Sequence, residues 1–254
     1  MYHFFVPKEH IVGHDVFICG EDVNHIKNVL RMKKGDELIV LNGIDQNEYH
    51  CMIEDLEPDR IWCKICFIKK DGVELPSKVY LFQSLPKSDK MELVIQKAVE
   101  LGVYQVIPVA AKRSVVKLDQ KKETAKLQRW NMIAEAAAKQ SKRGIIPQVT
   151  KVMTMEEAFT YAESFEHKLI PYEMADMDSM KQTKACIEAI RDGQNIAVMI
   201  GPEGGFDEKE VEQACESGFI PITLGKRILR TETAGFTVMS WIMYQLELAK
   251  AGNE

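Results

Sequence analysis

Two patterns of apolar and polar residues follow one another along the chain. In the first 70 residues, short apolar segments are separated by turn sequences such as KKGDE and NGIDQN, as is typical of strands joined by turns. One predicted helix, 21–32, interrupts them, with Val23, Ile26, Val29 and Leu30 on a common face. The predicted strands are 3–6, 15–18, 37–43, 48–56 and 60–68. Several short strands with one helix favour a small β-barrel.

The second pattern begins after KKDGVELPSK, where Gly72 and Pro76 mark the predicted linker. Here strands alternate with helices, which is typical of a parallel sheet covered on both faces. The predicted strands are 78–85, 104–111, 167–173, 195–200 and 221–225, and the predicted helices are 88–102, 123–143, 180–193, 207–218 and 229–250. Asp207 and Glu210 have capping-box spacing, and Gly218 ends that helix. We therefore expect two domains, 1–72 and 73–254, the second of the α/β class.

The composition changes this picture little. With 254 residues, of which 46% are hydrophobic and 28% charged, the chain is globular, and disordered, collagen-like and disulfide-scaffold proteins are excluded. Because no apolar run approaches the roughly 20 residues that cross a bilayer, and no signal-peptide pattern opens the chain, we expect a soluble, cytoplasmic protein. The six cysteines are expected to be buried and reduced. Cys63 and Cys66 lie in a strand pattern without a second pair, so no metal site is expected.

Charge is spread unevenly along the chain. Residues 78–151 carry 15 basic and 6 acidic side chains, a net of +9, whereas residues 1–72 have a net charge of −4. A local positive potential attracts polyanions even when the whole protein is acidic. The alternative is that these side chains only cover solvated helix faces. The density of the cluster favours an anionic partner; its members are Lys112, Arg113, Lys117, Lys121, Lys122, Lys126, Arg129, Lys139, Lys142 and Arg143.

Two glycine-containing loops are the strongest candidates for a ligand site. The sequence lacks G-x-G-x-x-G, the P-loop, H-E-x-x-H and G-x-S-x-G. Gly201-Pro202-Glu203-Gly204-Gly205 and the loop 224–234 each follow an apolar strand, and ligands of open α/β sheets bind at such strand ends. The alternatives are an ordinary tight turn for the first loop and, for Thr231 in the second, only a helix cap.

The sequences IGPEGGFDEKE (200–210) and LGKRILRTETA (224–234) resemble the signature of the SPOUT methyltransferases. They are most similar to the RsmE family, which methylates N3 of a uridine in small-subunit ribosomal RNA. The resemblance extends to LPKSDKMELVIQKAVELGV, RSV at 113–115, KLQRW, EAAAKQSKR and NHIKNVLRMKKGDEL, and so covers nearly the whole chain. At IPYE (170–173) the first ligand loop of the family varies.

The resemblance implies a PUA-like β-barrel at 1–72 that binds RNA, followed at 73–254 by a trefoil-knotted SPOUT domain with a parallel sheet. It also implies S-adenosylmethionine as cofactor, small-subunit ribosomal RNA as partner, and a homodimer with its sites near the interface. The implied cofactor-binding residues are Ile170, Pro171, Tyr172, Ile200, Gly201, Pro202, Glu203, Gly204, Gly205, Leu224, Gly225, Ile228, Leu229, Arg230, Thr231 and Thr233.

Chemistry suggests roles for three polar side chains of the two glycine-containing loops. Uracil N3 becomes nucleophilic when its imide proton leaves, and a guanidinium can stabilise the resulting charge on the carbonyl oxygens; Arg230 is the candidate. Glu232 or Glu203 could accept the proton, although Glu203 could equally be a loop carboxylate bonded to backbone N–H groups. The expected RNA contacts are Arg113, Arg129 and Arg143, with Lys112 and Arg31 in addition. Ribose 2′-O methylation of RNA, or a non-catalytic RNA-binding or ribosome-assembly role, are the alternatives.

Overall fold

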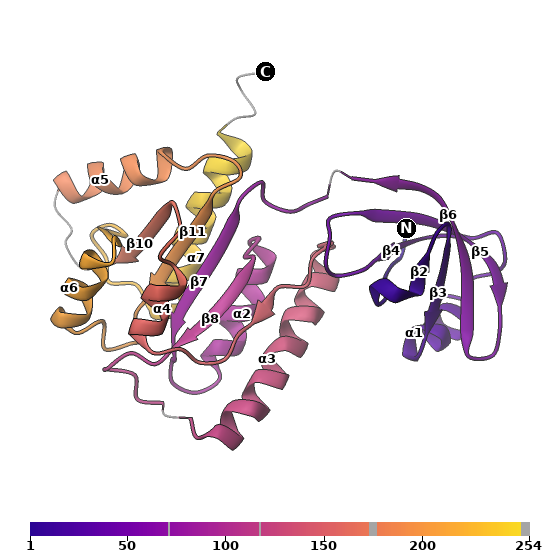
Figure 1. Ribbon diagram of the computed structural model, residues 1–254, viewed down its shortest axis with the longest axis horizontal. Helices are drawn as coiled ribbons and strands as arrows, with labels where there is room; N and C mark the ends of the chain where they lie inside the picture. The colour runs from indigo at the N-terminus through magenta and orange to yellow at the C-terminus, as the bar shows by residue number, and fades with distance from the viewer. Residues whose placement is uncertain (71, 117, 173–176, 250–254) are drawn as a thin grey trace. The chain divides into compact units, whose positions relative to one another are not determined.

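The computed structural model describes residues 1–70, 72–116, 118–172 and 177–249, and its chain divides into two compact units (Figure 1). Unit 1 comprises Met1–Glu74 and Ala138–Ile146, and unit 2 comprises Leu75–Ala137 and Pro147–Glu254. The chain therefore leaves unit 1, returns to it for nine residues and leaves again. The boundary at 72/73 stays a prediction.

Unit 1 is built on one six-stranded sheet, and its strands contribute to a single hydrophobic core. The order is β1 (His3–Phe5), β4 (Glu37–Leu41), β5 (Glu48–Leu56), β6 (Arg60–Lys69), β3 (Asp15–Cys19) and β2 (Ile11–Val12). Only β1 and β4 pair in parallel among the strand pairs described. Alternate residues such as Ile18, Leu38 and Ile53 point into the core, where Ile26 joins them. All five strands predicted in this region are confirmed.

The predicted helix at 21–32 is shorter and irregular. It consists of α1 (Glu21–Asn24) and a π-helical turn (His25–Val29), in which the Leu30 N–H donates to the His25 carbonyl. The segment ends at Arg31, whose φ of 56° leaves the helical region.

The segment 138–146 completes unit 1. The Ile146 N–H donates to the Gly43 carbonyl at 3.0 Å, and Arg143 is buried against Glu74. The guanidinium donates from Nε and Nη2 to the Glu74 carboxylate, which also accepts from the Ile145 N–H. Their mutual attraction and the added Ile145 hydrogen bond offset part of the cost of removing both charges from water.

Unit 2 is an α/β layered domain, as predicted. Its strands are β12 (Ile220–Ile222), β10 (His167–Pro171), β11 (Asn195–Ile200), β7 (Lys78–Ser84), β8 (Gln105–Val109) and β9 (Gln148–Val149), in that order and all parallel. Its helices are α2 (Lys90–Glu100), α3 (Gln120–Gln140), α4 (Met155–Tyr161), α5 (Met177–Glu188), α6 (Glu208–Glu216) and α7 (Thr231–Met243), which a π-helical turn (Tyr244–Leu248) extends.

Both faces of this sheet are covered, because successive strand residues point to opposite sides. Phe82 and Met199 pack with α4 and α6 in one buried cluster. On the other face, Leu81 and Ile200 lie against α7 close to Gly235, and α7 packs on α2. The parallel, doubly covered sheet predicted from the alternating pattern is thus confirmed. The trefoil knot implied by the resemblance stays a prediction.

The sequence pattern missed two elements of unit 2, β9 and α4. Strand β9 has two residues and α4 has seven, which is too few for a periodicity to emerge. A signal for α4 was nevertheless present: Thr154 and Glu157 form a capping box like that of Asp207 and Glu210 in α6.

The prediction for the cysteines is correct in one respect and wrong in another. All six thiols are free, but Cys19, Cys66 and Cys215 are exposed. Three positions separate Cys63 from Cys66 in β6, so the two side chains must face opposite sides of the sheet, and only Cys63 reaches the core.

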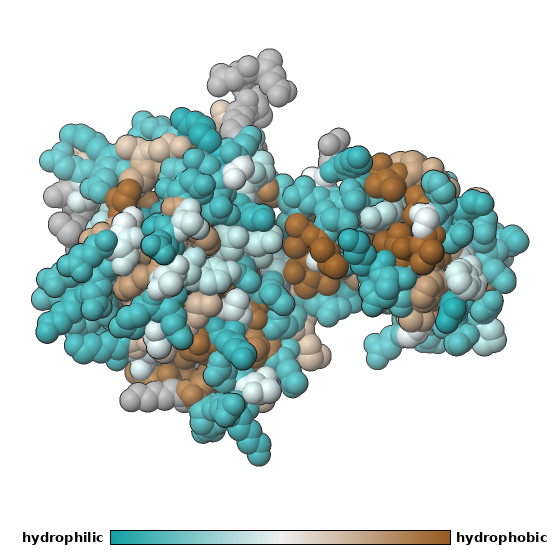
Figure 2. Space-filling view, viewed as in Figure 1, coloured by the Kyte–Doolittle hydropathy of each residue, from teal (hydrophilic) through white to brown (hydrophobic). Residues whose placement is uncertain are grey.

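The surface seen in Figure 2 is largely hydrophilic, with apolar residues gathered in separate patches. In the described part of the chain, no helix combines the length and apolar character needed to cross a membrane. Nor do three or more His, Cys, Asp or Glu side chains come together there as a metal-binding group.

Candidate active site

A pocket of about 760 Å³ lies at the carboxyl edge of the unit 2 sheet. It forms there because β10, β11 and β12 are parallel neighbours, so the loops that follow them meet at one edge. Its lining residues are Lys90, Arg113, Pro171, Tyr172, Ile200, Gly201, Pro202, Glu203, Gly204, Gly205, Phe206, Thr223, Leu224, Gly225, Arg227, Ile228, Leu229, Arg230, Thr231 and Ala234. The two glycine-containing loops singled out in the sequence therefore come together.

Two of the sixteen residues expected at the cofactor do not line this pocket. Ile170 is fully buried in β10 and belongs to the core beneath the sheet edge. Thr233 is exposed in the first turn of α7, whereas Thr231 and Ala234 lie on the side that meets the pocket. In one helical turn only some side chains can face the pocket, and the sequence alone did not show which of them do. Glu173, the last residue of IPYE, lies outside the described residues.

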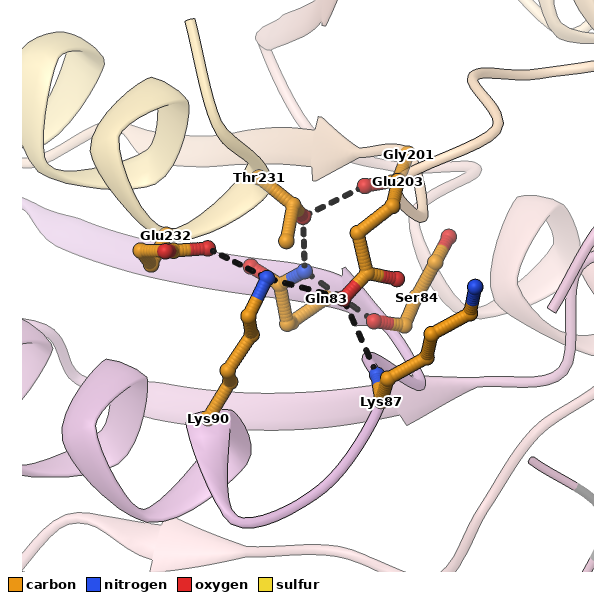
Figure 3. A network of polar contacts seen from close by, with 8 residues as sticks. All are labelled: Gln83, Ser84, Lys87, Lys90, Gly201, Glu203, Thr231 and Glu232. Atoms are coloured by element: carbon orange, nitrogen blue, oxygen red, sulfur yellow. Dashed lines mark hydrogen bonds and ion pairs between the residues drawn. The ribbon is translucent and has the colours of Figure 1, made fainter. Parts of the chain in front are cut away.

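The loop after β11 is held to its surroundings at three points. The Thr231 hydroxyl donates to the Gly201 carbonyl at 2.6 Å and accepts from Gln83 Nε2 at 2.9 Å (Figure 3). Arg113 Nη1 donates to the Gly204 carbonyl at 3.2 Å. Glu203 supplies the third point through its carboxylate. Thr231 is therefore not the helix cap: the N-cap position belongs to Arg230, and Thr231 ties α7 to the loop.

Glycine is required in this loop and in the loop after β12 for different reasons. A Cβ at Gly201 would lie 3.2 Å from the Phe206 ring, which is tighter than an ordinary contact, so the ring would have to shift to admit a side chain. Gly205 and Gly225 have φ values of 68° and 96°, which side chains of L-residues rarely tolerate. The backbone of both loops is thus shaped before any ligand arrives.

Lys90, at the start of α2, is a site residue that the sequence analysis missed. Its ammonium lies 3.0 Å from Glu203 Oε1 and 3.5 Å from Glu232 Oε2 (Figure 3). The Glu203 carboxylate also accepts from the Lys87 N–H at 3.1 Å. The signal was the polar segment LPKSDK after the strand 78–85, but nothing in the chain order showed that this strand lies beside β11.

These contacts shift the ionisation of both partners. Burial raises the pKa of Glu203, but hydrogen bonds from its own N–H, from Lys90 and from the Lys87 N–H outweigh burial and bring the pKa below its ordinary value. The hydrogen bond with Glu203 raises the pKa of Lys90; desolvation opposes it, and the charges of Glu203 and Glu232 add to the increase. At neutral pH the Lys90 ammonium therefore faces a charged Glu203 carboxylate.

Arg230 stands apart from this cluster. It is exposed, lines the pocket and precedes the first turn of α7. Its guanidinium makes no hydrogen bond or ion pair with any described residue, which leaves the donors available to a ligand. Glu232, by contrast, is mostly buried with its carboxylate toward Lys90.

The residues expected to contact RNA have different environments. Lys112 and Arg113 are exposed near the pocket, at 3.1 and 3.6 Å from Asp207. Arg129 is exposed, but its guanidinium donates from Nε and Nη2 to Glu92. Arg31 is exposed in unit 1.

The predicted role of Arg143 in RNA binding has to be corrected. It is 3% exposed and its guanidinium is paired with Glu74, so the structure does not support the predicted phosphate contact. Its partner lies 69 positions away in the chain, which is why a local count of basic residues misjudged it.

Known proteins with similar sequences agree with this arrangement. A family model for the RNA methyltransferase domain matches residues 73–243, and one for the RNA methyltransferase PUA domain matches residues 18–66. Ribosomal RNA small subunit methyltransferase E of Bacillus subtilis (strain 168) is 38% identical over 251 residues, which cover 98% of each chain. The same-named protein of Mesomycoplasma hyopneumoniae (strain 232) is 36% identical, over 94% of this chain and 98% of its own length.

Solved structures of methyltransferases are also similar to this chain over nearly its whole length. The crystal structure of a ribosomal RNA small subunit methyltransferase E from Neisseria gonorrhoeae, bound to S-adenosyl methionine, has a TM-score of 0.77 and 32% identity and covers 94% of this chain and 95% of its own. A protein of Legionella pneumophila in complex with the same cofactor has a TM-score of 0.76 and 30% identity, over 95% and 96%. The matches span both the glycine loops and the N-terminal unit, and the chain therefore belongs to the RsmE family of RNA methyltransferases.

Proposed function

We propose that this protein transfers a methyl group from S-adenosylmethionine to N3 of a uridine in the 16S RNA of the small ribosomal subunit. The observation that carries the proposal is the pocket itself, in which the two glycine-containing loops of the family meet at the carboxyl edge of the parallel sheet. Two relatives similar over nearly the whole chain hold S-adenosylmethionine, which supports the same cofactor here.

The residues of the pocket fit this cofactor. Its volume of about 760 Å³ lies within the usual range of roughly 300–1,000 Å³ for small-molecule sites. Leu224, Ile228 and Leu229 offer apolar surface, and the crowding at Gly201 leaves loop backbone rather than side chains along the wall. We propose that these groups, with Pro171 and Tyr172, hold the adenosyl part. When bound, S-adenosylmethionine supplies a methyl group on a positively charged sulfur.

Arg230 is the proposed catalytic residue. The N3–CH3 bond forms as the S–CH3 bond breaks, which leaves S-adenosylhomocysteine, and the N3 proton passes to water. Loss of that proton spreads negative charge onto the two neighbouring carbonyl oxygens of uracil. A guanidinium at the pocket mouth with uncommitted donors can stabilise that charge in the transition state. Because N3 is covered in a base pair, the substrate uridine has to be unpaired or flipped out.

Replacing Arg230 tests this role. Arg230→Ala is expected to lower the methylation rate by about 100-fold or more, as the loss of one oxyanion-type donor does. Radiolabelled methyl transfer to small-subunit RNA measures the rate, calorimetry measures the S-adenosylmethionine Kd, and circular dichroism checks the fold. Lys226→Ala, an exposed cation of the same loop that does not line the pocket, is the matched control. Full activity in Arg230→Ala would remove Arg230 from the mechanism.

The product identifies the reaction. Mass analysis of the digested RNA is expected to show a methyl group on the base of uridine. A methylated ribose would replace the proposal with 2′-O methylation of RNA. Binding of RNA without binding of S-adenosylmethionine would leave a non-catalytic ribosome-assembly role.

The remaining parts of the proposal concern partners. Lys112, Arg113, Arg129 and Arg31 are the exposed cations of the predicted set through which RNA would be bound, and such contacts weaken as salt rises. A homodimer and a cytoplasmic location are proposed with them. Exposed apolar side chains on the C-terminal helix, Tyr244 and Leu248, support the homodimer.

A further inference from the structure

Lys90 connects three separate parts of the chain at the pocket. It belongs to α2, Glu203 belongs to the loop after β11, and Glu232 belongs to the first turn of α7 (Figure 3). The neighbouring Gln83–Thr231–Gly201 hydrogen bonds join β7, α7 and the same loop. The two sets of contacts therefore fix the loop after β11 against the start of α7 from two sides.

The surroundings make the Lys90 contacts stronger than those of a surface ion pair. The side chains of Lys90, Glu203 and Glu232 are 29%, 26% and 14% exposed, so the pairs are partly shielded from water. Glu232 Oε2 is buried and makes no hydrogen bond with any described residue. The Lys90 ammonium at 3.5 Å is thus the charge that compensates it.

The contacts of Lys90 with the two carboxylates argue against either carboxylate as the acceptor of the substrate proton. An efficient general base has a pKa near the working pH, whereas the contacts of Glu203 bring its pKa below the ordinary value. Protonation of either carboxylate would also remove an ion pair of Lys90. Besides Lys90, the cationic residues Arg113, Arg227 and Arg230 line the same pocket.

We propose that Lys90 is a positioning residue that joins Glu203 to Glu232, and that the two carboxylates anchor the cofactor loop instead of accepting the substrate proton. The inference deepens the proposed function and rests on it for the kinetic measurement only. The shape of the loop in the ligand-free protein tests it separately.

Binding of S-adenosylmethionine gives the first test, by calorimetry on the full chain. Lys90→Met is expected to raise the Kd by about tenfold, the effect of one charge-assisted hydrogen bond. Lys90→Arg, which keeps the charge and the donors, is expected to restore it to within about threefold. Glu203→Gln combined with Lys90→Met is expected to bind no more weakly than Lys90→Met alone, because both changes remove the same pair.

Kinetics separate anchoring from proton transfer. Glu203→Gln and Glu232→Gln are expected to raise the KM for S-adenosylmethionine and to leave kcat within about threefold, whereas loss of a general base lowers kcat by roughly 100–10,000-fold. Lys97→Met is the matched control, since Lys97 lies on the same helix and pairs with Glu100 at 2.8 Å, away from the pocket.

Hydrogen exchange of the ligand-free protein gives a readout independent of the reaction. In Lys90→Met, the amides of residues 201–206 are expected to exchange about tenfold faster than in Lys97→Met, because a local contact has been lost. An unchanged Kd and unchanged exchange in Lys90→Met would overturn the proposal, and so would a large loss of kcat in Glu203→Gln or Glu232→Gln at constant Kd. If the wild type binds S-adenosylmethionine but methylates no RNA, the proposed function fails while the Kd and exchange results still decide the role of Lys90.

Discussion

Burial divides the six cysteines into groups of different chemistry. Cys51 and Cys63 lie in the core of unit 1, and burial raises the pKa of each thiol to about 12. Because the thiolate is the reactive form, these thiols are almost entirely protonated at pH 8. Cys186 is half-buried and burial raises its pKa as well, whereas Cys19, Cys66 and Cys215 are exposed.

Thiol titration of the native protein is therefore expected to proceed in stages. At pH 8, Cys19, Cys66 and Cys215 should react first with an aromatic disulfide reagent, Cys186 more slowly, and Cys51 and Cys63 only after unfolding in guanidinium chloride. Peptide mass analysis after each stage identifies the modified residues. Early modification of Cys63 would contradict the placement of its side chain in the core.

Helices α4 and α6 of unit 2 both begin with a capping box, but the two capping boxes have different neighbours. In α4, Thr154 and Glu157 exchange hydrogen bonds and contact nothing of the pocket. In α6, Asp207 and Glu210 do the same, yet Asp207 also pairs with Lys112 and Arg113, and Glu210 accepts from the Lys112 N–H at 2.7 Å. The cap of α6 thus also holds the segment that carries Arg113.

Alanine substitution at the two caps is expected to separate stability from binding. Thr154→Ala and Asp207→Ala should each lower the free energy of unfolding by about 1 kcal/mol, the usual value of an N-cap. Only Asp207→Ala should also weaken S-adenosylmethionine binding, because Arg113 then loses a partner and holds Gly204 less firmly. Urea unfolding and calorimetry measure the two effects, and equal affinity in both variants would contradict this link.

Features that depend on neighbouring residues could be predicted from the sequence, whereas features that depend on distant contacts could not. Local signals gave most strands, the α6 cap and both glycine-containing loops, because each depends on residues close together in the chain. The site residue Lys90 could not be found this way, since it depends on β7 pairing with β11 across more than 100 positions. Arg143 was misjudged for the same reason: its environment is set by distant Glu74. The family could be identified from the sequence motifs, but the geometry of the pocket became clear only from the order of the strands in the sheet.

At the scale of the whole molecule, exposed apolar residues near the C-terminus support the proposed homodimer. Tyr244 and Leu248 are each 58% exposed and lie four positions apart on the turn that extends α7. Leu93, on the helix that packs against α7, is 43% exposed. Neighbouring apolar side chains on a protein surface commonly mark an interface.

Sedimentation equilibrium is expected to give twice the monomer mass for the wild type. The double variant Tyr244→Asp and Leu248→Asp should sediment as a monomer, because four carboxylates would then face one another across the interface. Met132→Asp, which changes an apolar side chain that is 70% exposed on α3, should remain dimeric. A wild-type protein that stays monomeric at micromolar concentration would refute the homodimer.

The ion pair between Glu74 and Arg143 also constrains how the protein is made. Synthesis proceeds from the N-terminus, so 68 residues must be added after Glu74 before its guanidinium partner exists. Until then the nascent N-terminal unit lacks its last segment, and removing one member of a buried pair costs about 3–5 kcal/mol. The N-terminal unit can therefore form this ion pair only after more than half of the polypeptide has been synthesised, although nearly all of its own residues are made first.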